Sequence, residues 1–398
     1  MHYFDFHYSW EQRKFGSLLE ETRNKTTVED EDTLLSCAID GMYLNSELFS
    51  HFRGSSNIGY LKVKKNDLIL SAQNLHLGNC NVNLRFEHGI ISPAYKVYEL
   101  VGCNPLFMQA WVKKDSTKDF FLKASTEGAS VCRKNIVWEE LYKQELPVPS
   151  IEEQTKVGEY FNSLDHLITL HQRKCDETKK LKKFMLQKMF PKKDAKKPEI
   201  RFAGFTDDWE QRKLGDICSR VQGNDGRMEL PTLTISAANG WMKQEDRFSG
   251  NIAGKEQTNY TLLHKGELSY NHGNSKLAKY GTVFSLQTYE EALVPRVYHS
   301  FKVENESADF IEYYFATKIP DRELRKLISS GARMDGLLNI GYDDFMGIKM
   351  MFPSASEQDK IAEYFRALDH IITLHQRKCD ELKEFKKYML QNMFPQKG

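Results

Sequence analysis

Residues 150–191 read SIEEQTKVGEYFNSLDHLITLHQRKCDETKKLKKFMLQKMFP, and residues 354–395 read SASEQDKIAEYFRALDHIITLHQRKCDELKEFKKYMLQNMFP. The two stretches share 29 of 42 residues at a constant offset of 204. A shorter match precedes each stretch, because the Trp-Glu-Gln-Arg-Lys motif of Trp10–Lys14 returns as Trp209–Lys213. The chain is therefore an internal repeat of two halves of about 200 residues, too long a period for a solenoid.

Apolar and small residues recur in each copy with alternating spacings of four and three. In the second copy they are Ile361, Phe365, Leu368, Ile372, His375, Cys379 and Leu382, and in the first Val157, Phe161, Leu164, Ile168, His171, Cys175 and Thr178. A period of 3.5 predicts a long helix with a coiled-coil seam, which a proline ends in each copy. We expect the two helices, each roughly 60 Å long, to pack antiparallel with pseudo-two-fold symmetry. The alternative is two independent amphipathic helices, each folded onto its own domain.

The segments between the repeats, 15–149 and 214–353, match only at sparse positions such as Pro149 and Pro353. Both contain alternating strand patterns and short helical patterns, so we predict two α/β or α+β globular domains joined by the two long helices. The expected boundaries are 1–149 for the first globular domain, 150–191 for the first helix, 192–208 for a basic linker, 209–353 for the second globular domain and 354–398 for the second helix.

Composition limits the function. The 398 residues carry 56 Lys+Arg and 55 Asp+Glu, a net charge of +1, which argues against a stand-alone, strongly basic nucleic-acid binder. No stretch approaches the 18 apolar residues of a membrane span, and no secretory signal is expected. The seven cysteines are scattered without a CxxC pair, as in a cytoplasmic protein with reduced thiols.

Catalytic signatures are absent: the sequence has no GxxxxGK[ST], no GxGxxG after a strand, no HExxH and no GxSxG. Asn104-Pro105-Leu106-Phe107 resembles the Asn-Pro-Pro-Phe motif of adenine amino-methyltransferases, but an N-cap Asn followed by Pro at the first helical position explains it more simply. His171 with Cys175, repeated as His375 with Cys379, has the residue types of a His₂Cys₂ metal site. We expect these residues to fill the helical seam instead, and we predict no metal.

Basic and polar residues supply candidate DNA contacts. Residues 171–199 hold 11 Lys+Arg against 4 Asp+Glu, which suits either a solvated helix face with its linker or contact with phosphates or an acidic partner. Amide and cationic side chains in loops of the two globular domains can read base edges. The candidates are Lys64, Lys65, Gln73, Asn74, His76, Arg133, Asn224, Arg227, Asn271, His272, Asn274, Lys276, Lys279, Arg296 and Arg333.

The whole arrangement resembles the specificity subunit of type I restriction–modification systems. The motifs that carry the resemblance are Trp10–Lys14 and Trp209–Lys213, the helix entries Pro149–Gln154 and Pro353–Gln358, and the endings Met189–Pro191 and Met393–Pro395. Their duplication in order around two unlike domains is the specific signal. One departure is that the first half lacks the Arg201-Phe202-x-Gly204-Phe205 segment that leads into the second half.

The resemblance implies that each globular domain is a target-recognition domain for one half of a bipartite double-stranded DNA sequence. The helices would space the two halves and dock two methyltransferase subunits, and restriction (translocase) subunits would complete the complex. The expected spacer and docking residues are Phe161, Leu164, Ile168, His171, Cys175, Phe365, Leu368, Ile372, His375 and Cys379. Adenine methylation and ATP-dependent cleavage, with S-adenosylmethionine, ATP and Mg, would belong to the partner subunits, so this chain would bind no cofactor.

Two other functions compete with this one. The first is a scaffold whose coiled coil joins two protein-binding domains without a DNA role. The second is a methyltransferase that uses Asn104–Phe107. Salt-dependent DNA binding together with a methyltransferase partner separates the first from a specificity subunit, and cofactor binding by the isolated chain tests the second.

Overall fold

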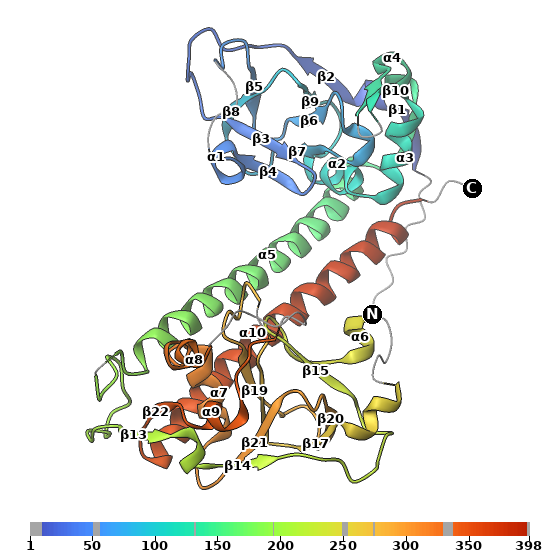
Figure 1. Cartoon of the computed structure of the whole chain (residues 1–398). Helices are drawn as coiled ribbons and strands as arrows, with labels where there is room; N and C mark the ends of the chain where they lie inside the picture. Colours follow the sequence, from blue (N-terminus) through green and yellow to red (C-terminus); the bar gives the residue numbers. More distant parts are fainter. Residues whose placement is uncertain are drawn as a thin grey trace. The chain divides into compact units, whose positions relative to one another are not determined.

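The computed structural model describes residues 10–50, 56–130, 133–193, 195–248, 254–273, 275–328 and 337–395. The chain divides into two compact units, 1–173 with 375–398 (unit 1) and 174–374 (unit 2). Each unit contains one globular domain and parts of both long helices, α5 (Ile151–Lys188) and α10 (Ala355–Asn392) (Figure 1). The unit boundaries therefore fall inside the helices, because each domain packs on helical residues from both copies of the repeat.

The globular domain of unit 1 is built from short strands and four short helices. The strands are β1 (Glu11–Lys14), β2 (Leu19–Thr22), β3 (Leu35–Ala38), β4 (Gly41–Leu44), β5 (Leu61–Lys64), β6 (Leu68–Ser71), β7 (Cys80–Val82), β8 (His88–Ile91), β9 (Tyr95–Leu100), β10 (Ser125–Ser130), β11 (Arg133–Ile136) and β12 (Glu145–Val148). The helices are α1 (Asn45–Leu48), α2 (Pro105–Val112), α3 (Asp115–Lys123) and α4 (Trp138–Lys143).

The globular domain of unit 2 is built in the same way. Its strands are β13 (Glu210–Lys213), β14 (Cys218–Val221), β15 (Leu233–Ser236), β16 (Gly240–Lys243), β17 (Thr261–His264), β18 (Leu268–Asn271), β19 (Thr282–Ser285), β20 (Glu291–Val294), β21 (His299–Val303) and β22 (Lys349–Phe352). Its helices are α6 (Gln244–Phe248), α7 (Ala308–Ala316), α8 (Asp321–Leu327) and α9 (Tyr342–Met346).

The two domains share one strand topology despite their unlike sequences. A four-stranded sheet has the order β2-β9-β6-β7 in unit 1 and β14-β21-β18-β19 in unit 2. Three two-stranded pairs also correspond: β1-β12 with β13-β22, β3-β4 with β15-β16, and β5-β8 with β17-β20. The ladders among the described strands are antiparallel, so of the two predicted classes the domains are α+β. The described part of unit 1 also contains the antiparallel pair β10–β11.

The turns explain how unlike sequences reach the same topology. The tight connection from β5 to β6 has Asn66 at φ 72°, and the connection from β17 to β18 has Gly266 at φ 85°. Asn and Gly are the residue types that adopt this left-handed conformation at least cost. Both domains therefore make the same strand–turn–strand connection with different turn residues.

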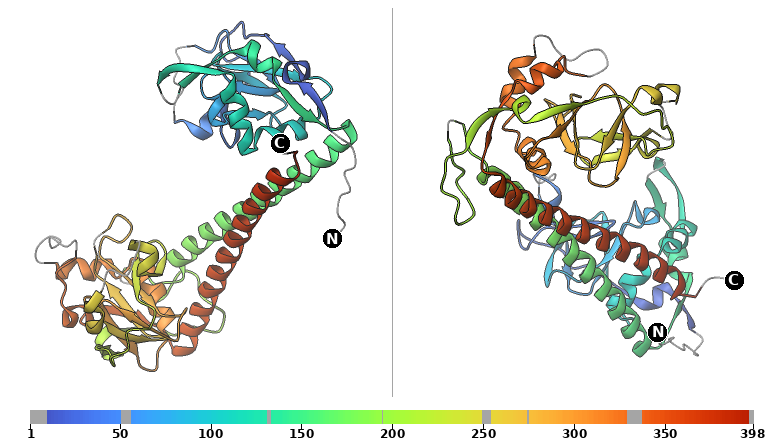
Figure 2. Two further views of the ribbon diagram at one scale, coloured as in Figure 1. Left: turned by 90° about the vertical axis from the view of Figure 1, so that its right-hand side faces the viewer. Right: turned by 90° about the horizontal axis from the view of Figure 1, so that it is seen from below.

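The repeated helices pack antiparallel within each unit (Figures 1 and 2). In unit 1, Asp165 pairs with Lys386 at 2.5 Å and Cys379 Sγ lies 3.9 Å from the Ile168 carbonyl oxygen. In unit 2 the residues at the equivalent positions make the same contacts: Lys182 with Asp369 at 2.6 Å, and Cys175 Sγ with the Ile372 carbonyl oxygen at 3.8 Å. The predicted antiparallel pairing with two-fold repetition is confirmed, and independent helices are excluded.

The end of each helix closes the core of the domain encoded by the other half. Phe394, at the end of α10, packs on Trp10, Phe107 and Phe161 of unit 1, with ring centroids 5.6, 5.6 and 6.1 Å away. Phe190, just after α5, packs in unit 2 on Trp209, Phe310 and Phe365 at 6.0, 5.5 and 6.1 Å. The repeated Trp and Met-Phe-Pro motifs are thus two sides of one aromatic cluster, formed once in each unit.

The helix entries differ in their polar contacts. In unit 1, Trp10 Nε1 donates to the Glu153 carboxylate at 2.9 Å. In unit 2, Arg201 makes two bonds of 2.7 Å to Glu357, the equivalent of Glu153. The segment before Trp209 therefore supplies Arg201, which binds the first turn of α10. The first half has no matching segment, and there Trp10 makes the bond to the first turn of α5.

Asn104 caps α2. Its Oδ1 accepts hydrogen bonds from the backbone N–H groups of Leu106 and Phe107, and Pro105 occupies the first turn. The capping interpretation of Asn104–Phe107 is confirmed. The amide oxygen of Asn104 therefore caps the helix instead of accepting a hydrogen bond from the amino group of a substrate.

Candidate nucleic-acid interface

Three loops of unit 1 meet beside the carboxyl end of β6. The Ala72 N–H donates to the Ala94 carbonyl oxygen at 3.0 Å, and the Lys134 N–H donates to the Gln73 carbonyl oxygen at 3.2 Å. These bonds hold together the loop after β6, the loop between β8 and β9, and the β10–β11 hairpin. Gln73 is exposed and Asn74 half-buried at this place.

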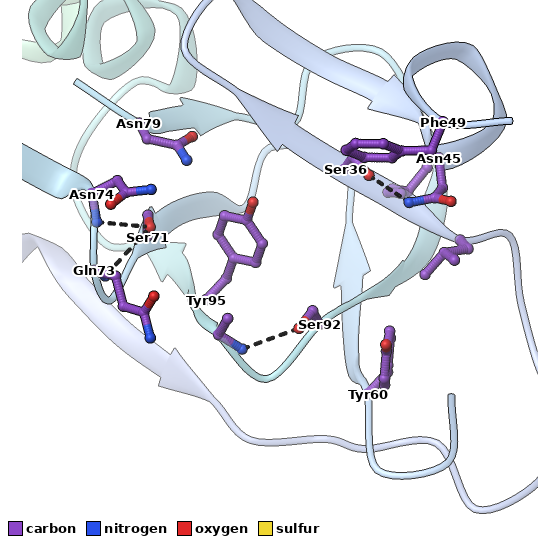
Figure 3. A pocket seen from close by; sticks show the side chains of 13 residues that line it. Ser36, Asn45, Phe49, Tyr60, Ser71, Gln73, Asn74, Asn79, Ser92 and Tyr95 are labelled. Carbon is purple, nitrogen blue, oxygen red and sulfur yellow. Dashed lines mark hydrogen bonds between the residues drawn. The ribbon is translucent and has the colours of Figure 1, made fainter. Parts of the chain in front are cut away.

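A pocket of about 460 Å³ opens next to these loops (Figure 3). Gln73, Asn74, Ser71 and Asn79 lie on one side of it and Phe49 with Asn45 on the other, and Tyr95 stands between them. The lining contains amides, hydroxyls and aromatic rings but no charged side chain. Such a surface suits the edge or face of a neutral polar ring, as nucleic-acid bases present, and it does not suit a phosphate.

The other unit 1 candidates lie elsewhere or inside. Lys64 and Lys65 flank the turn before β6, at the end of that strand opposite Gln73, and pair with Glu99 at 3.3 Å and Glu87 at 2.5 Å. His76 is only 8% exposed, and burial and then the charge of Lys134 lower its pKa, so its ring is neutral. Arg133 lies in β11, but its side chain is outside the described part of the structure.

In unit 2 the corresponding loops carry most of the basic candidates. Lys276 and Lys279, in the loop after β18, are exposed, as is Arg296 between β20 and β21. None of the three forms an ion pair within the part of the chain that the structure describes. They are available to phosphates or to guanine edges. Asn274 and Arg333 lie outside the described residues.

Asn271 and His272 serve the loop itself. Asn271 Nδ2 donates to the Ile235 carbonyl oxygen at 3.2 Å, and its Oδ1 accepts from the Gly273 N–H at 3.0 Å. His272 is 4% exposed, and both ring nitrogens lie within hydrogen-bonding distance of backbone carbonyl oxygens. A base edge would find no ring nitrogen of His272 available.

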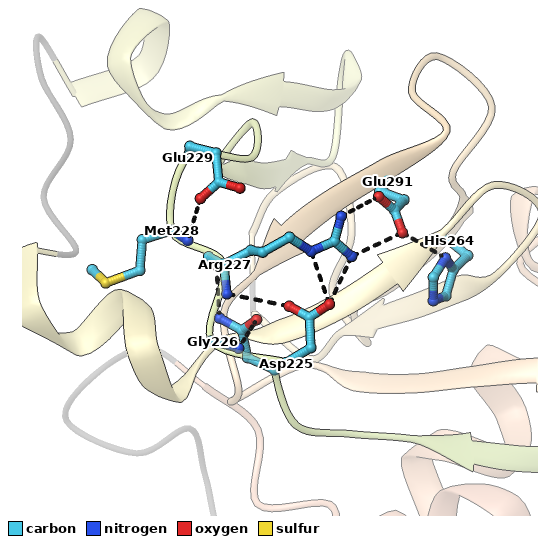
Figure 4. Close-up of polar contacts among 8 residues, drawn as sticks. Asp225, Gly226, Arg227, Met228, Glu229, His264 and Glu291 are labelled. Atoms are coloured by element: carbon cyan, nitrogen blue, oxygen red, sulfur yellow. Dashed lines mark hydrogen bonds and ion pairs between the residues drawn. The ribbon is translucent and has the colours of Figure 1, made fainter.

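Asn224 and Arg227 lie at the other end of β20 from Arg296. The Arg227 guanidinium binds Glu291 at 2.7 and 3.0 Å and Asp225 at 2.8 Å, and His264 lies 3.4 Å from the same Glu291 carboxylate (Figure 4). Bonds to Glu291 and then Asp225 raise the pKa of Arg227. Asn224 Nδ2 donates to the Arg227 carbonyl oxygen at 3.1 Å. These bonds fix the loop that contains residues 224–227. To contact a guanine, Arg227 would have to break its bonds to both carboxylates.

Sequence reasoning missed the residues that assemble the interface. Ser71, Asn79 and Tyr95 line the unit 1 pocket, and Lys134 ties the hairpin to Gln73 through its backbone. These residues come from strands and loops far apart in the chain. Of this arrangement, only the strand-to-loop transition after β6 is visible in the sequence.

The predicted spacer residues form the seam between α5 and α10. Phe161, Leu164, Cys175, Phe365, Leu368 and Cys379 are buried, and Ile168, His171, Ile372 and His375 are partly buried. His171 and His375 meet each other in unit 1, with Nδ1 atoms 2.9 Å apart. Among the described residues, no three His, Cys, Asp or Glu side chains are grouped to hold a metal ion.

Large apolar side chains on the outer faces of the same helices are exposed at equivalent positions. Leu181 is 45% exposed and its equivalent Phe385 46%, while Phe184 is 48% exposed and its equivalent Tyr388 60%. Residues three apart on a helix share a face, so α5 presents an aliphatic–aromatic pair and α10 an aromatic pair at the equivalent positions. Duplicated exposed apolar surface of this kind is typical of protein–protein contacts. Within the described residues, no helix is long and apolar enough to cross a membrane.

Comparisons with known proteins agree with this architecture. Residues 206–384 match the family described as the type I restriction modification DNA specificity domain. The chain is 22% identical to the type I restriction enzyme MjaVIII specificity subunit of Methanocaldococcus jannaschii, over 96% of this chain and 91% of that one. It is 21% identical to the putative type I restriction enzyme MjaX specificity subunit of the same organism, over 96% and 92%.

A solved structure has the same fold. The type I restriction–modification S subunit from M. genitalium superposes with a TM-score of 0.61 at 13% identity, covering 100% of this chain and 99% of that one. Full-length similarity, a matched DNA specificity domain and the duplicated domain–helix plan point to one function, recognition of a DNA target. Residues 206–384 thus match the type I restriction modification DNA specificity domain family, and the chain is similar over its length to specificity subunits of type I restriction enzymes.

Proposed function

We propose that the two globular domains read the two halves of one bipartite DNA target, one half each. The observation that carries the proposal is a common strand framework with different loop side chains. In unit 1 the loop after β6 offers the neutral amides Gln73 and Asn74, whereas in unit 2 the corresponding loop offers Lys276 and Lys279. Equivalent loops with different chemistry would recognise different bases, with phosphate contacts fixing position and side chains specifying sequence.

A domain exchange tests this assignment. Residues 15–149 are replaced by the corresponding segment of another specificity subunit, and the methylated sequences of the host genome are read with the original and the hybrid chain. We expect one half of the recognised sequence to change and the other to remain. The reciprocal control replaces residues 214–353 and should alter only the other half. A hybrid that changes both halves, or neither, contradicts the proposal.

The helices would set the spacing between the halves. Each residue adds 1.5 Å to a helix. Insertion of one heptad at the same position of both copies keeps the seam in phase, and it should lengthen the unspecified spacer of the target without altering the bases read. Methylation sequencing again reports the result. If the spacer kept its length, the helices would not set the distance between the two halves of the target.

We propose further that the chain is not an enzyme and docks two methyltransferase subunits, with restriction subunits joining the complex. Methylation and cleavage, and the S-adenosylmethionine, ATP and Mg they need, would belong to those partners. The duplicated exposed pairs Leu181–Phe184 and Phe385–Tyr388 support two equivalent docking sites. No feature of the domains favours a protein scaffold over DNA recognition.

Charge-matched variants test the docking surface. Phe184→Glu with Tyr388→Glu adds two negative charges on the exposed faces and should abolish assembly with the methyltransferase while leaving thermal stability unchanged. The control is Lys183→Gln with Lys387→Gln, exposed neighbours whose replacement changes the charge by the same amount. Co-purification with the methyltransferase subunit measures both. Equal assembly in the two double variants would exclude this surface.

A further inference from the structure

His272 makes two hydrogen bonds that a neutral ring cannot make together. Nδ1 lies 2.8 Å from the Leu338 carbonyl oxygen, and Nε2 lies 3.0 Å from the Val297 carbonyl oxygen. A carbonyl oxygen only accepts, so each bond needs an N–H on the ring. The neutral imidazole carries one N–H and the imidazolium carries two. The surroundings of His272 are therefore satisfied only when the ring is a cation.

The two bonds tie three separate segments together. His272 belongs to the loop after β18, Val297 to the connection between β20 and β21, and Leu338 to the segment before α9. The backbone adds a third bond, because the Leu338 N–H donates to the His272 carbonyl oxygen at 2.9 Å. These segments also carry Lys276, Lys279 and Arg296, and the His272 side chain itself is only 4% exposed.

We propose that His272 is a positioning residue that, as an imidazolium, pins the loops with which the second domain reads its half of the DNA target. This inference rests on the proposed function, since it assigns a role within the same interface. It replaces the direct base contact that the sequence suggested for His272. It also makes recognition of one half-site dependent on a proton.

The groups around the ring allow a single positive charge there. His299 packs against His272 with ring centroids 4.9 Å apart, and its Nε2 donates to the Ile340 carbonyl oxygen at 2.9 Å. Burial lowers the pKa of His299 against the opposing effect of the bond to Ile340, and the charges of His272 and Arg220 lower it further, which disfavours a second positive charge there. The titratable and charged groups nearby, element by element, are Tyr270 of β18, His299 of β21, Tyr342 of α9, Arg220 of β14, Asp321 of α8 and Arg296 before β21.

Unit 1 provides an internal comparison. The residue that follows β6, at the place where His272 follows β18, is Ala72. There the Ala72 N–H donates to Ala94 and the Lys134 N–H donates to Gln73. Those backbone bonds do not titrate, so we expect the first half-site to lack the pH dependence that His272 gives the second.

The direction of the pH effect follows from the bonds. At low pH the ring keeps both protons and both bonds, and the contribution to loop order is fully present. A ring that has lost one proton turns a nitrogen lone pair toward a carbonyl oxygen, and one of the two bonds is gone. That contribution is then lost. Recognition by the second domain should weaken with rising pH.

The test measures discrimination, the ratio of affinities for the target and for a duplex altered in one half, between pH 6.0 and 8.5. The protein is the full chain assembled with its methyltransferase subunits, and the target is the sequence identified by methylation sequencing. For the half read by unit 2 we expect discrimination to fall about tenfold, the scale of a hydrogen bond to a charged group. For the half read by unit 1 we expect no change. Equal pH profiles for the two halves would overturn the proposal.

Two variants separate positioning from general packing. His272→Gln cannot titrate and should flatten the profile of the second half while the first half is still discriminated, which also shows that the complex is assembled. His299→Gln, the neighbouring ring with one bond, should keep the profile. A His272→Gln complex with the wild-type profile would refute the role of this residue.

A measurement on the wild-type protein needs neither the variants nor DNA. With nitrogen-15-labelled histidine, the side-chain resonances of His272, assigned through its contacts with His299, should show both ring nitrogens protonated at pH 6.0. A neutral tautomer there would overturn the proposal. If His272 is doubly protonated but the complex shows no sequence-specific binding, the result contradicts the proposed function and leaves the protonation of His272 established.

Discussion

The Nδ1 atoms of His171 and His375 lie 2.9 Å apart, and the two residues occupy the same position of the internal repeat. One nitrogen has to donate and the other to accept, so at least one of the two rings is neutral. A contact between equivalent residues is what two-fold repetition of the helices requires. A polar pair in an apolar seam also disfavours helix registers that would separate its members.

The histidine pair predicts coupled mutational effects. His171→Leu should lower the free energy of unfolding by about 1 kcal/mol, because His375 loses a hydrogen-bond partner at a partly buried position. His171→Leu with His375→Leu should cost less than the sum of the two single changes. Thermal unfolding of the four chains measures the coupling. Strictly additive effects would mean that the contact does not contribute to stability.

Gly158 predicts a steric effect where α5 meets α2. A Cβ added at Gly158 would lie 2.6 Å from Leu106 Cβ and 2.7 Å from the Phe107 nitrogen. Gly158→Ala should therefore destabilise unit 1 by about 1–3 kcal/mol, despite the better helix propensity of alanine. The equivalent residue of α10 is Ala362, which is buried, and Ala362→Gly should cost about 1 kcal/mol through helix propensity. Chemical denaturation measures the change in unfolding free energy of both variants. A Gly158→Ala chain more stable than the wild type would contradict the close packing of α5 on α2.

Arg201 predicts a large loss in unit 2. Glu357 is 1% exposed and is bound by both arms of Arg201. Arg201→Met should cost about 3–5 kcal/mol, because it leaves a buried carboxylate without its cation. In unit 1, Trp10→Phe removes one hydrogen bond to Glu153 and part of the ring that packs on Phe107 and Phe394, and should cost about 1–3 kcal/mol. An Arg201→Met chain as stable as the wild type in unfolding experiments would show that the arginine is dispensable.

Asp67 predicts a pH-dependent stability term. The side chain is 3% exposed, and burial raises the pKa of its carboxyl to about 6, against the opposing effect of the Lys64 N–H bond. The folded state then binds more protons than the unfolded state between about pH 4 and 6, so this contribution falls as the pH rises through that window. Compared with the wild type, the Asp67→Asn variant should gain more stability at pH 7.5 than at pH 4.5. A difference between variant and wild type that is the same at both pH values would exclude the shifted pKa.

The sequence predicted what depends on local pattern. The 3.5 spacing of the seam identified the long helices, and the Asn-Pro pair identified a cap at Asn104. Loop chemistry depends on contacts between distant segments. The two ring nitrogens of His272 face carbonyl oxygens of residues 25 and 66 positions away. The Arg227 guanidinium is bound by Glu291 of β20, 64 positions away. Neither partner has any local signal.

The strand pair at the base of each domain has an evolutionary consequence. The chain enters the first domain along β1 and leaves it along β12, its antiparallel neighbour, and β13 and β22 do the same for the second domain. Entry and exit points therefore lie side by side, fixed by residues next to the repeated motifs. Everything between them can be replaced as one cassette by genetic exchange, without altering the repeated helices. A lineage that exchanges such cassettes acquires a new target in one event, whereas point mutation of individual loops would first pass through weakened recognition.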